Sequence, residues 1–469
     1  MWKLENYASN MALVEDSGTS LSYVELLNSA EELYQNIEER CLIFTLCTNS
    51  IGSILGYVCF INHGIVPVLL NKDLEIGFRD KLFDIYQPSY LWVPKEMAEQ
   101  FSEYSLKYEN SGYILMKMNK KVTYTMHDDL ALLLTTSGST GSPKFVRQSY
   151  TNILDNAQAI AEYLELDETE RPITTLPMNY TYGLSVINSH LLVGATILVT
   201  DKSIFQKEFW TFFKEEGATS FSGVPYTYEM LDRIKFERME LPSLRTLTQA
   251  GGKLMPKLHE KFAKYAKDNQ KKFVVMYGQC EATARMGYLP SDKALEKCGS
   301  MGIAIPNGRF CLKDDNGNDI TEPYVTGELV YEGKNVTLGY AQEGSDLMKG
   351  DERQGVLYTG DMARFDEEGY YYIVGRKKRF LKIYGNRVNL DEIDCLVKGK
   401  FDIECASDGV DDHMYIFITE ADVEKNVKNF IVEKTKLNQA AFNIIVINEI
   451  PKNDAGKILY QELKKYIVV

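Results

Sequence analysis

Short apolar segments alternate with helical patterns along the first part of the chain. Leu42 to Leu46 and Val66 to Leu70 have the length and composition of buried strands, and the apolar run Ile51 to Asn62 between them has the length of a helix. A strand, a helix and a second strand form a crossover unit, and such units build parallel sheets covered by helices. The order of these segments therefore predicts an α/β fold.

The same alternation continues further along the chain. Ser22 to Glu25 has the Ser-x-x-Glu pattern of a capping box, and the apolar residues Leu26, Ala30, Leu33 and Ile37 then fall on one helical face. The other predicted elements are a helix from Thr151 to about Leu164 and strands at Tyr90 to Val93, Ile173 to Leu176, Thr196 to Thr200, Leu244 to Thr248 and Phe273 to Met276.

The pattern changes after Gly299, where β-rich segments with Gly and Asn turns become frequent. The segments that begin at Cys311 and Gly327 are typical of hairpins, and Tyr370 to Val374 is rich in strand-forming residues. We therefore expect a β-rich part in this region.

A basic run from Arg376 to Arg379 follows the last of these segments. We place the main domain boundary here. The expected organisation is a large N-terminal domain (residues 1–375), built of mixed, mostly parallel sheets with helices and a β-rich part at about residues 300–375. A small α+β C-terminal domain (residues 376–469) follows.

The charge of the chain restricts its partners. The 469 residues carry a net charge of −14 and 45% of them are hydrophobic, as in an ordinary globular protein. An acidic surface disfavours nonspecific binding to nucleic acid and to anionic membranes. We expect neither partner, and an anionic ligand must be held by local donors.

The eight cysteines form no CxxC pair and no Cys/His cluster with metal-ligand spacing, which favours a reducing compartment. The N-terminus lacks the basic-then-apolar plan of a signal peptide. The apolar stretch Ile51 to Val68 is interrupted by Asn62 and His63, so it does not indicate a membrane span. We expect a cytoplasmic protein.

A loop rich in Ser, Thr and Gly follows a predicted strand in the first domain. Leu130 to Leu134 is apolar, Thr135 to Gly141 supplies hydroxyls, backbone N–H groups and two glycines, and Lys144 adds a cation. Such a loop suits a polyphosphate, which needs many converging donors. The P-loop pattern Gly-x-x-x-x-Gly-Lys-Ser/Thr is absent. Composition alone is equally consistent with an ordinary loop.

Five further segments follow in order: Tyr277 to Glu281, Tyr358 to Asp361, Gly375 to Lys378, Ile383 to Arg387 and Asn453 to Lys457. With the loop, they resemble the ordered signatures of the adenylate-forming (ANL) superfamily. This superfamily includes acyl-CoA synthetases, firefly-type luciferases and adenylation domains of nonribosomal peptide synthetases. The resemblance covers nearly the whole chain, from Ala12 onward, and is strongest to stand-alone ligases that join an acyl or aryl acid to a thiol.

The resemblance implies a two-step reaction with ATP and Mg²⁺. The carboxylate of a small acid attacks the α-phosphate of ATP, which gives an acyl-adenylate and pyrophosphate. The acyl group then passes to a thiol, either that of CoA or the phosphopantetheine arm of a carrier protein. No fused carrier domain follows Lys457, so we expect the acceptor to be a separate molecule.

The resemblance also assigns the groups that would handle phosphate. Lys457 would bridge the substrate carboxylate and the α-phosphate, because a compact charge on a long stem suits that role. Glu281 would be the Mg²⁺ ligand. The β- and γ-phosphates would contact Thr136, Ser137, Gly138, Ser139, Thr140, Gly141 and Lys144.

The remaining nucleotide contacts fall on three segments. Tyr277 would stack on adenine, and Asp361 and Arg376 would bind the ribose hydroxyls. The other residues assigned to the nucleotide are Gly251, Gly252, Gly278, Gln279 and Cys280. Cys280 replaces the usual threonine, which weakens or removes a hydroxyl contact to the α-phosphate.

The acid pocket is predicted from Met178 to Val186. Gly183 stands where adenylation domains for amino acids carry an aspartate, and residues 172–199 contain no carboxylate. A buried ammonium without a counter-charge would be costly. Tyr180 replaces a histidine of acyl- and aryl-acid ligases. The expected lining of Tyr180, Tyr182, Gly183, Ser222 and Tyr226 favours a short, hydroxylated or aromatic acid.

Two further positions carry the expected second step. Lys378 matches the hinge between the two domains of the superfamily, and Gly385 lies on the loop that would reach the thiol channel. Two alternatives remain: activation of an amino acid for a carrier protein, and a degenerate nucleotide-binding protein without catalysis. The second is motivated by Cys280, Tyr180 and Phe145, which stands where a glycine is common.

Overall fold

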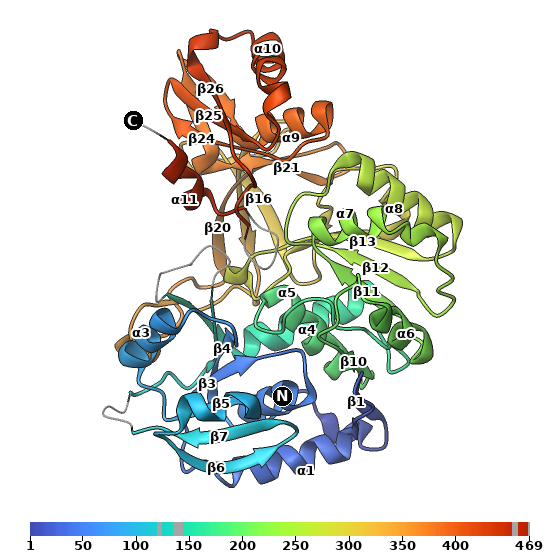
Figure 1. Ribbon diagram of the computed structural model, residues 1–469, viewed down its shortest axis with the longest axis vertical. Helices are drawn as coiled ribbons and strands as arrows, with labels where there is room; N and C mark the ends of the chain where they lie inside the picture. Colours follow the sequence, from blue (N-terminus) through green and yellow to red (C-terminus); the bar gives the residue numbers. More distant parts are fainter. Residues whose placement is uncertain (120–123, 136–143, 453–457, 468–469) are drawn as a thin grey trace. The chain divides into compact units, whose positions relative to one another are not determined.

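The computed structural model describes residues 1–119, 124–135, 144–452 and 458–467 (Figure 1). They form a mixed α/β structure with several sheets, in agreement with the predicted fold class. The chain divides into two compact units. One consists of Met1–Cys298, Gly302–Arg309 and Tyr331–Leu357, and the other of Gly299–Met301, Phe310–Val330 and Tyr358–Val469.

The largest sheet of the first unit has eight strands in the order β19-β9-β8-β4-β3-β5-β7-β6. Its centre is parallel, because β8, β4, β3 and β5 pair in parallel, and antiparallel pairs flank this centre. The strands are β3 (Leu42–Cys47), β4 (Val66–Asn71), β5 (Tyr90–Pro94), β6 (Ser105–Asn110), β7 (Tyr113–Lys117), β8 (Leu130–Thr135), β9 (Phe145–Ser149) and β19 (Gly339–Ala341).

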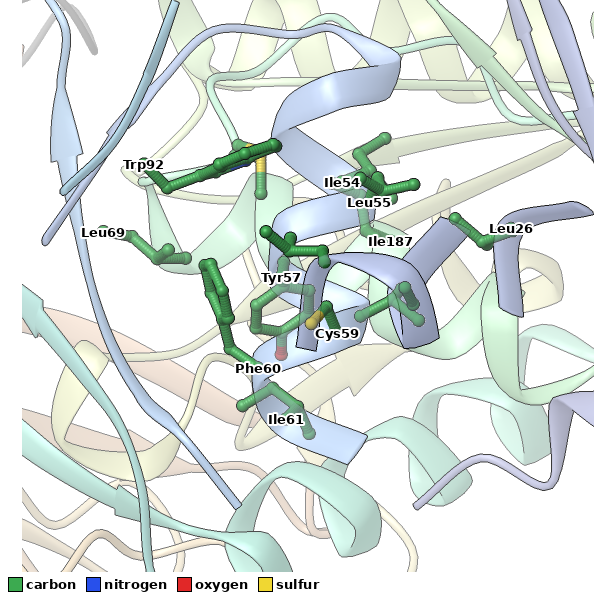
Figure 2. Close-up of a cluster of buried hydrophobic side chains, with 14 of the residues drawn as sticks. Leu26, Ile54, Leu55, Tyr57, Cys59, Phe60, Ile61, Leu69, Trp92 and Ile187 are labelled. Carbon is green, nitrogen blue, oxygen red and sulfur yellow. The ribbon is translucent and has the colours of Figure 1, made fainter. Parts of the chain in front are cut away.

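Helix α2 (Ile51–Asn62) lies in the core of this unit, and every residue from Ile51 to Ile61 is buried. Figure 2 shows its side chains in the same cluster as Leu26, Trp92 and Ile187, which belong to three other elements. Ser50 caps the helix by accepting a hydrogen bond from the Ser53 backbone N–H. An apolar helix of this kind is stable only inside a core.

A second sheet of the first unit has five strands in the order β11-β12-β13-β14-β15, and its first three strands are parallel. A third sheet has the order β10-β1-β2. The strands are β1 (Met11–Glu15), β2 (Ser20–Ser22), β10 (Ile197–Val199), β11 (Ser220–Gly223), β12 (Thr246–Gln249), β13 (Lys272–Tyr277), β14 (Gly287–Leu289) and β15 (Ile303–Ala304). The helices of this unit besides α2 are α1 (Tyr23–Tyr34), α3 (Ile76–Tyr86), α4 (Tyr150–Leu164), α5 (Thr181–Leu192), α6 (Lys207–Glu215), α7 (Pro225–Arg233) and α8 (Pro256–Asp268).

The second unit contains three sheets in the orders β17-β16-β18-β20-β21, β22-β23 and β24-β25-β26. One hydrophobic core of this unit lies entirely within residues 381–444. The elements are β16 (Arg309–Lys313), β17 (Asp319–Ile320), β18 (Gly327–Glu332), β20 (Val356–Phe365), β21 (Tyr371–Arg376), β22 (Phe380–Ile383), β23 (Asn386–Asn389), β24 (Cys405–Val410), β25 (His413–Ile418), β26 (Phe442–Val446), α9 (Leu390–Phe401), α10 (Glu424–Thr435) and α11 (Tyr460–Leu463).

Most of the predicted elements are present, but two predictions were wrong. Residues 173–176 do not form a strand, because Ile173 makes only an isolated bridge to Leu198. The segment that begins at Gly327 is a single strand, β18, and not a hairpin. The capping box at Ser22 is confirmed. Among the described residues, no helix is long and apolar enough to cross a bilayer.

A carboxyl group is buried in the core of the second unit. Asp394 on α9 accepts a hydrogen bond from Arg379 Nη2 at 3.0 Å and is almost fully buried. Burial raises the pKa of Asp394 to about 7, although the Arg379 guanidinium opposes the shift. The folded protein therefore holds this proton more tightly than the unfolded chain does.

We predict that Asp394 makes the second unit less stable as the pH rises from about 4 to about 7. A raised carboxyl pKa contributes its stabilisation below the unfolded value of about 4 and loses it as the pH passes the folded value, by up to about 4 kcal/mol. Hydrogen exchange of β24 and β25 should show this loss in the wild type, and Asp394→Asn should reduce it. Equal pH profiles in both proteins would contradict the assignment.

Candidate active site

The predicted site residues differ in how far the structure describes them. Thr136, Ser137, Gly138, Ser139, Thr140, Gly141 and Lys457 lie outside the described residues. Lys144 directly precedes β9 and is half-buried. The other predicted positions can be placed in one unit or the other.

Glu281 is held in a tight turn after β13. The chain passes so close to itself at Gly278 that a Cβ atom there would lie 1.6 Å from the carbonyl oxygen of Ala284. Only glycine fits this approach. The turn then forms a short 3-10 helix at Cys280–Ala282, and Glu281 lies in it.

A neighbouring loop fixes the backbone of this turn. The carbonyl oxygen of Glu281 accepts hydrogen bonds from the backbone N–H and the hydroxyl of Thr337, both at 3.0 Å. Asn335 is buried and donates to the carbonyl oxygens of Ala282 and Arg285. The position of the Glu281 carboxylate therefore depends on contacts between segments far apart in the sequence.

The ring of Tyr340 joins the charged groups of the candidate site. Its hydroxyl donates to Glu281 Oε1 at 2.7 Å. Lys144 Nζ lies 3.4 Å from the ring centroid, and the guanidinium carbon of Arg353 lies 4.7 Å from it. Pairing of β19 with β9 sets Tyr340 opposite Val146, two residues after Lys144. Two cations and a carboxylate therefore surround one phenol.

The ring contacts both cations, and Arg353 Nη1 also donates to the carbonyl oxygen of Glu281 at 3.4 Å. Neither Lys144 nor Arg353 pairs with a carboxylate in the part of the chain that the structure describes. Cation–π contacts hold a cation without neutralising it. Burial and the Glu281 charge raise the pKa of Tyr340 to about 12, although Arg353 opposes the shift, so the phenol remains a donor. This arrangement leaves positive charge for an anionic ligand.

The residues present fit a magnesium ion that is shared with a ligand. The described residues contain no cluster of three or more His, Cys, Asp or Glu side chains. Glu281 uses Oε1 for Tyr340, and no described residue donates to Oε2. Mg²⁺ is commonly bound by one or two carboxylates together with substrate phosphates. One open carboxylate oxygen is consistent with that mode.

The residues predicted to hold adenine lie at the ends of two adjacent parallel strands. Tyr277 ends β13 and accepts a hydrogen bond from Gln279 Nε2 at 3.3 Å. Gly251 and Gly252 follow the end of β12, which pairs with β13. The carboxyl ends of parallel strands are where open α/β sheets bind ligands. Cys280 is buried beside them.

Buried hydroxyl groups connect part of the predicted acid pocket. The Tyr182 hydroxyl and the Ser222 hydroxyl lie 2.8 Å and 2.9 Å from Thr248 Oγ1. The rings of Tyr180 and Tyr182 meet edge to face with 6.4 Å between centroids. Tyr226, at the first turn of α7, is 44% exposed. The structure therefore brings together Tyr180, Tyr182 and Ser222, and it adds Thr248.

Gly183 is required by packing at the start of α5. A Cβ atom at this position would lie 2.4 Å from the carbonyl oxygen of Pro177 and 3.0 Å from that of Leu176. An aspartate would not fit on this backbone. The backbone conformation around Gly183 therefore excludes an aspartate at this position of the pocket.

The second unit holds the predicted sugar contacts. Asp361 and Arg376 are opposite each other on β20 and β21, and Arg376 Nε lies 2.7 Å from Asp361 Oδ1. Asp361 is buried, whereas Arg376 is half-exposed. Lys378 is exposed in a 3-10 turn directly after β21, and Gly385 lies in the turn between β22 and β23.

Tyr340, Arg353 and Thr248 were not predicted as site residues from the sequence. Phe145, which departs from the superfamily pattern, was given no role. Tyr340, Arg353 and Thr248 become visible only when separate segments meet. Phe145 points into the core, where it is 1% exposed and packs on Tyr86 with 4.8 Å between ring centroids.

Comparison with family models identifies the family of this chain. Residues 79–341, more than half of the chain, match the family model described as AMP-binding enzyme. The chain belongs to the AMP-binding enzyme family. The matched region includes the phosphate loop, the Glu281 turn and Tyr340.

Named relatives of this AMP-binding enzyme are CoA ligases. The 4-hydroxybutyrate–CoA ligase 1 of Metallosphaera sedula is 30% identical over 363 residues, which are 73% of this chain and 63% of that protein. The oxalate–CoA ligase of Saccharomyces cerevisiae is 29% identical over 74% of this chain and 65% of that protein. The chain thus spans less than two-thirds of the length of either relative.

The fold also matches a solved structure. The o-succinylbenzoate CoA synthetase of Bacillus subtilis, in complex with its acyl-adenylate intermediate, superposes with a TM-score of 0.79 at 21% identity. The match covers 99% of this chain and 97% of that one. The likeness establishes the fold of the AMP-binding enzyme.

We predict that the Tyr340 hydroxyl orients Glu281 for magnesium. Tyr340→Phe keeps the ring under Lys144 and Arg353 but removes the hydrogen bond to the carboxylate, which is worth about 1.5–3 kcal/mol. Calorimetry should show ATP binding about tenfold weaker with Mg²⁺ and nearly unchanged without it. Tyr324→Phe, at a tyrosine that is 57% exposed and outside every predicted motif, is the matched control. Equal losses with and without Mg²⁺ would contradict this role.

Proposed function

We propose that this AMP-binding enzyme activates a carboxylic acid with ATP and passes the acyl group to a thiol. The acid attacks the α-phosphate, pyrophosphate leaves, and the acyl-adenylate then reacts with the thiol. The single observation that carries the proposal is the group around Tyr340, in which a carboxylate lies with two cations that pair with no carboxylate of the described residues. This group is suited to an ATP polyphosphate with its metal.

The first step requires two anions to approach each other. Lys144 and Arg353 would reduce the repulsion at the phosphates, and Glu281 would hold Mg²⁺. The metal, when bound, neutralises charge on the phosphate oxygens. Lys457 would contact both the substrate carboxylate and the α-phosphate, and Tyr277 would stack on adenine. Each cation would act where negatively charged groups of the acid and of ATP come close together.

The ribose contacts and the domain boundary are part of the same proposal. Asp361 would accept from the ribose hydroxyls, and Arg376, which pairs with it, would donate to them. We place the boundary of the small domain at residue 376, the last residue of β21. The eight cysteines are free thiols, which supports a reducing compartment such as the cytoplasm.

The pocket favours an acid without an α-amino group. Its described lining of Tyr182, Ser222 and Thr248 presents neutral hydroxyls, and Gly183 leaves no room for a carboxylate. The buried cation Arg285 contacts the Tyr182 ring, at 5.0 Å from its centroid, and would repel an ammonium. The relatives are named for 4-hydroxybutyrate and oxalate, which have no amino group.

The thiol acceptor is CoA in this proposal. The relatives are named CoA ligases, which supports CoA over the phosphopantetheine arm of a carrier protein. Lys378 would be the hinge that rotates the small domain between the two steps, and Gly385 would then line the thiol channel.

ATP–pyrophosphate exchange over pairs of carboxylic acids tests the proposal. Each pair consists of an α-amino acid and the same acid without the amino group. We expect exchange to require an acid, and the acid without the ammonium to exchange at least tenfold faster, because the described lining of the pocket offers an ammonium no counter-charge. A preference for amino acids would favour the carrier-protein alternative. Exchange with no acid at all would reject the proposed activity.

Substitutions at Lys457 and Lys378 should separate the two steps. Lys457→Ala removes the cation between two anions and should slow acyl-adenylate formation by several orders of magnitude, while thioester formation from supplied acyl-adenylate survives. Lys378→Pro fixes a hinge and should slow only thioester formation, by about a hundredfold or a barrier of roughly 3 kcal/mol. Single-turnover kinetics of each step measures both effects.

Matched controls test whether these effects are specific. Lys464→Ala, at an exposed lysine, and Lys378→Ala, which keeps backbone freedom, should leave both steps near wild-type rates. Gly385→Trp should slow only thioester formation, whereas Gly317→Trp should not. Both glycines lie in turns with φ near +85° and open space around the position of a Cβ atom. Equal loss in both steps for Lys457→Ala would refute its role.

A further inference from the structure

Arg285 is a buried arginine that contacts the predicted acid pocket. It follows Glu281 by four residues and is only 2% exposed. Its guanidinium lies 5.0 Å from the ring centroid of Tyr182. The hydroxyl of the same tyrosine lies in one group with Thr248 and Ser222. Tyr182 therefore contacts both Arg285 and the predicted acid pocket.

All hydrogen-bond partners of the Arg285 guanidinium are neutral. Nε donates to the Ser185 hydroxyl at 3.2 Å, and Nη1 donates to the Tyr163 hydroxyl and to Met276 Sδ, both at 2.9 Å. Within the described ranges, no carboxylate pairs with Arg285 and no acceptor lies on Nη2. A guanidinium has five N–H groups, so part of its donor capacity remains unused.

The other buried arginines of the molecule differ from Arg285 in this respect. The other arginines that are buried in the described ranges, Arg79 and Arg147, pair with Asp80 and Glu352, respectively. Removing a charge from water without a counter-charge is costly, and proteins normally pair buried charges. Arg285 is therefore the exception that needs an explanation.

The backbone of Arg285 is held firmly. Its carbonyl oxygen accepts from Asn156 Nδ2 at 2.8 Å and from Asn335 Nδ2 at 3.0 Å, and both asparagines are buried. Two separate segments, α4 and the loop of Asn335, therefore fix the backbone of this arginine, and its side chain contacts Ser185 on α5. A cation held so firmly, but without its counter-charge, is suited to an anionic group that arrives with a ligand.

We propose that Arg285 binds a second carboxylate of the acid substrate, so that the enzyme activates a dicarboxylic acid. The inference rests on the proposed function and specifies its substrate class. One carboxylate would react at the α-phosphate, and the other would pair with Arg285. Tyr182 and Ser222 would contact the body of the acid between them. The unused N–H groups of Nη2 provide the donors for this pair.

Exchange assays with dicarboxylic acids and their monoamides test this proposal. A monoamide keeps the size and the reacting carboxylate but removes the second charge. In the wild type, the dicarboxylic acid should have a kcat/KM about 100-fold above that of its monoamide. Arg285→Gln should raise KM for the dicarboxylic acid and bring the ratio to within about fivefold. Arg285→Lys, which keeps the charge, should retain part of the preference.

A binding measurement gives a second readout. A dicarboxylic acid should raise the Tm of the wild type and of Arg309→Gln, a control arginine whose side chain is 69% exposed and paired with Glu332. It should not raise the Tm of Arg285→Gln. A wild type that prefers monoamides, or an Arg285→Gln variant that loses both acids equally, would overturn the proposal. Phosphonate- or sulfonate-tailed acids that outperform the dicarboxylic acids would also overturn it.

The failure of this inference can be distinguished from failure of the proposed function. If neutral-tailed acids alone support exchange, acid activation stands and the dicarboxylic substrate is wrong. If no acid supports exchange, the proposed function fails, and the assignment of Arg285 fails with it.

Discussion

One neutral ring organises the charged groups of the candidate site. Tyr340 donates to Glu281 and lies against both Lys144 and Arg353. A chain with a net charge of −14 could easily neutralise such cations with its own carboxylates. The phenol instead holds them without cancelling their charge, which leaves them for phosphate. Local placement therefore matters more for anion binding here than the overall field, which opposes it.

Backbone packing keeps this arrangement in place. Close approach at Gly278 and the bonds from Thr337 fix the Glu281 turn, while β19 places Tyr340 next to the start of β9. Asn335 links the same turn to Arg285. The nucleotide side and the acid side of the first unit thus share one scaffold. A change at Asn335 would disturb both.

The fold could be read from the sequence where periodicity and turn signals agreed. The α2 helix and strands β3, β4 and β5 match their predicted ranges, because long apolar runs bounded by polar residues determine buried elements. Residues 173–176 have two β-branched threonines between Ile173 and Leu176, but they make only an isolated bridge at Ile173 and form no strand. Tyr340, Arg353, Thr248 and the neutral surroundings of Arg285 could not be predicted, since each depends on contacts between distant segments.

The central claim is that the acid becomes bonded to the α-phosphate of ATP. An acid with both carboxylate oxygens labelled with ¹⁸O, turned over with ATP and CoA, tests it most directly. The oxygen that attacks phosphorus stays with it when the thiol displaces the nucleotide. Mass spectrometry should therefore find one ¹⁸O atom in each AMP released. Unlabelled AMP, or label in phosphate or pyrophosphate, would contradict the account.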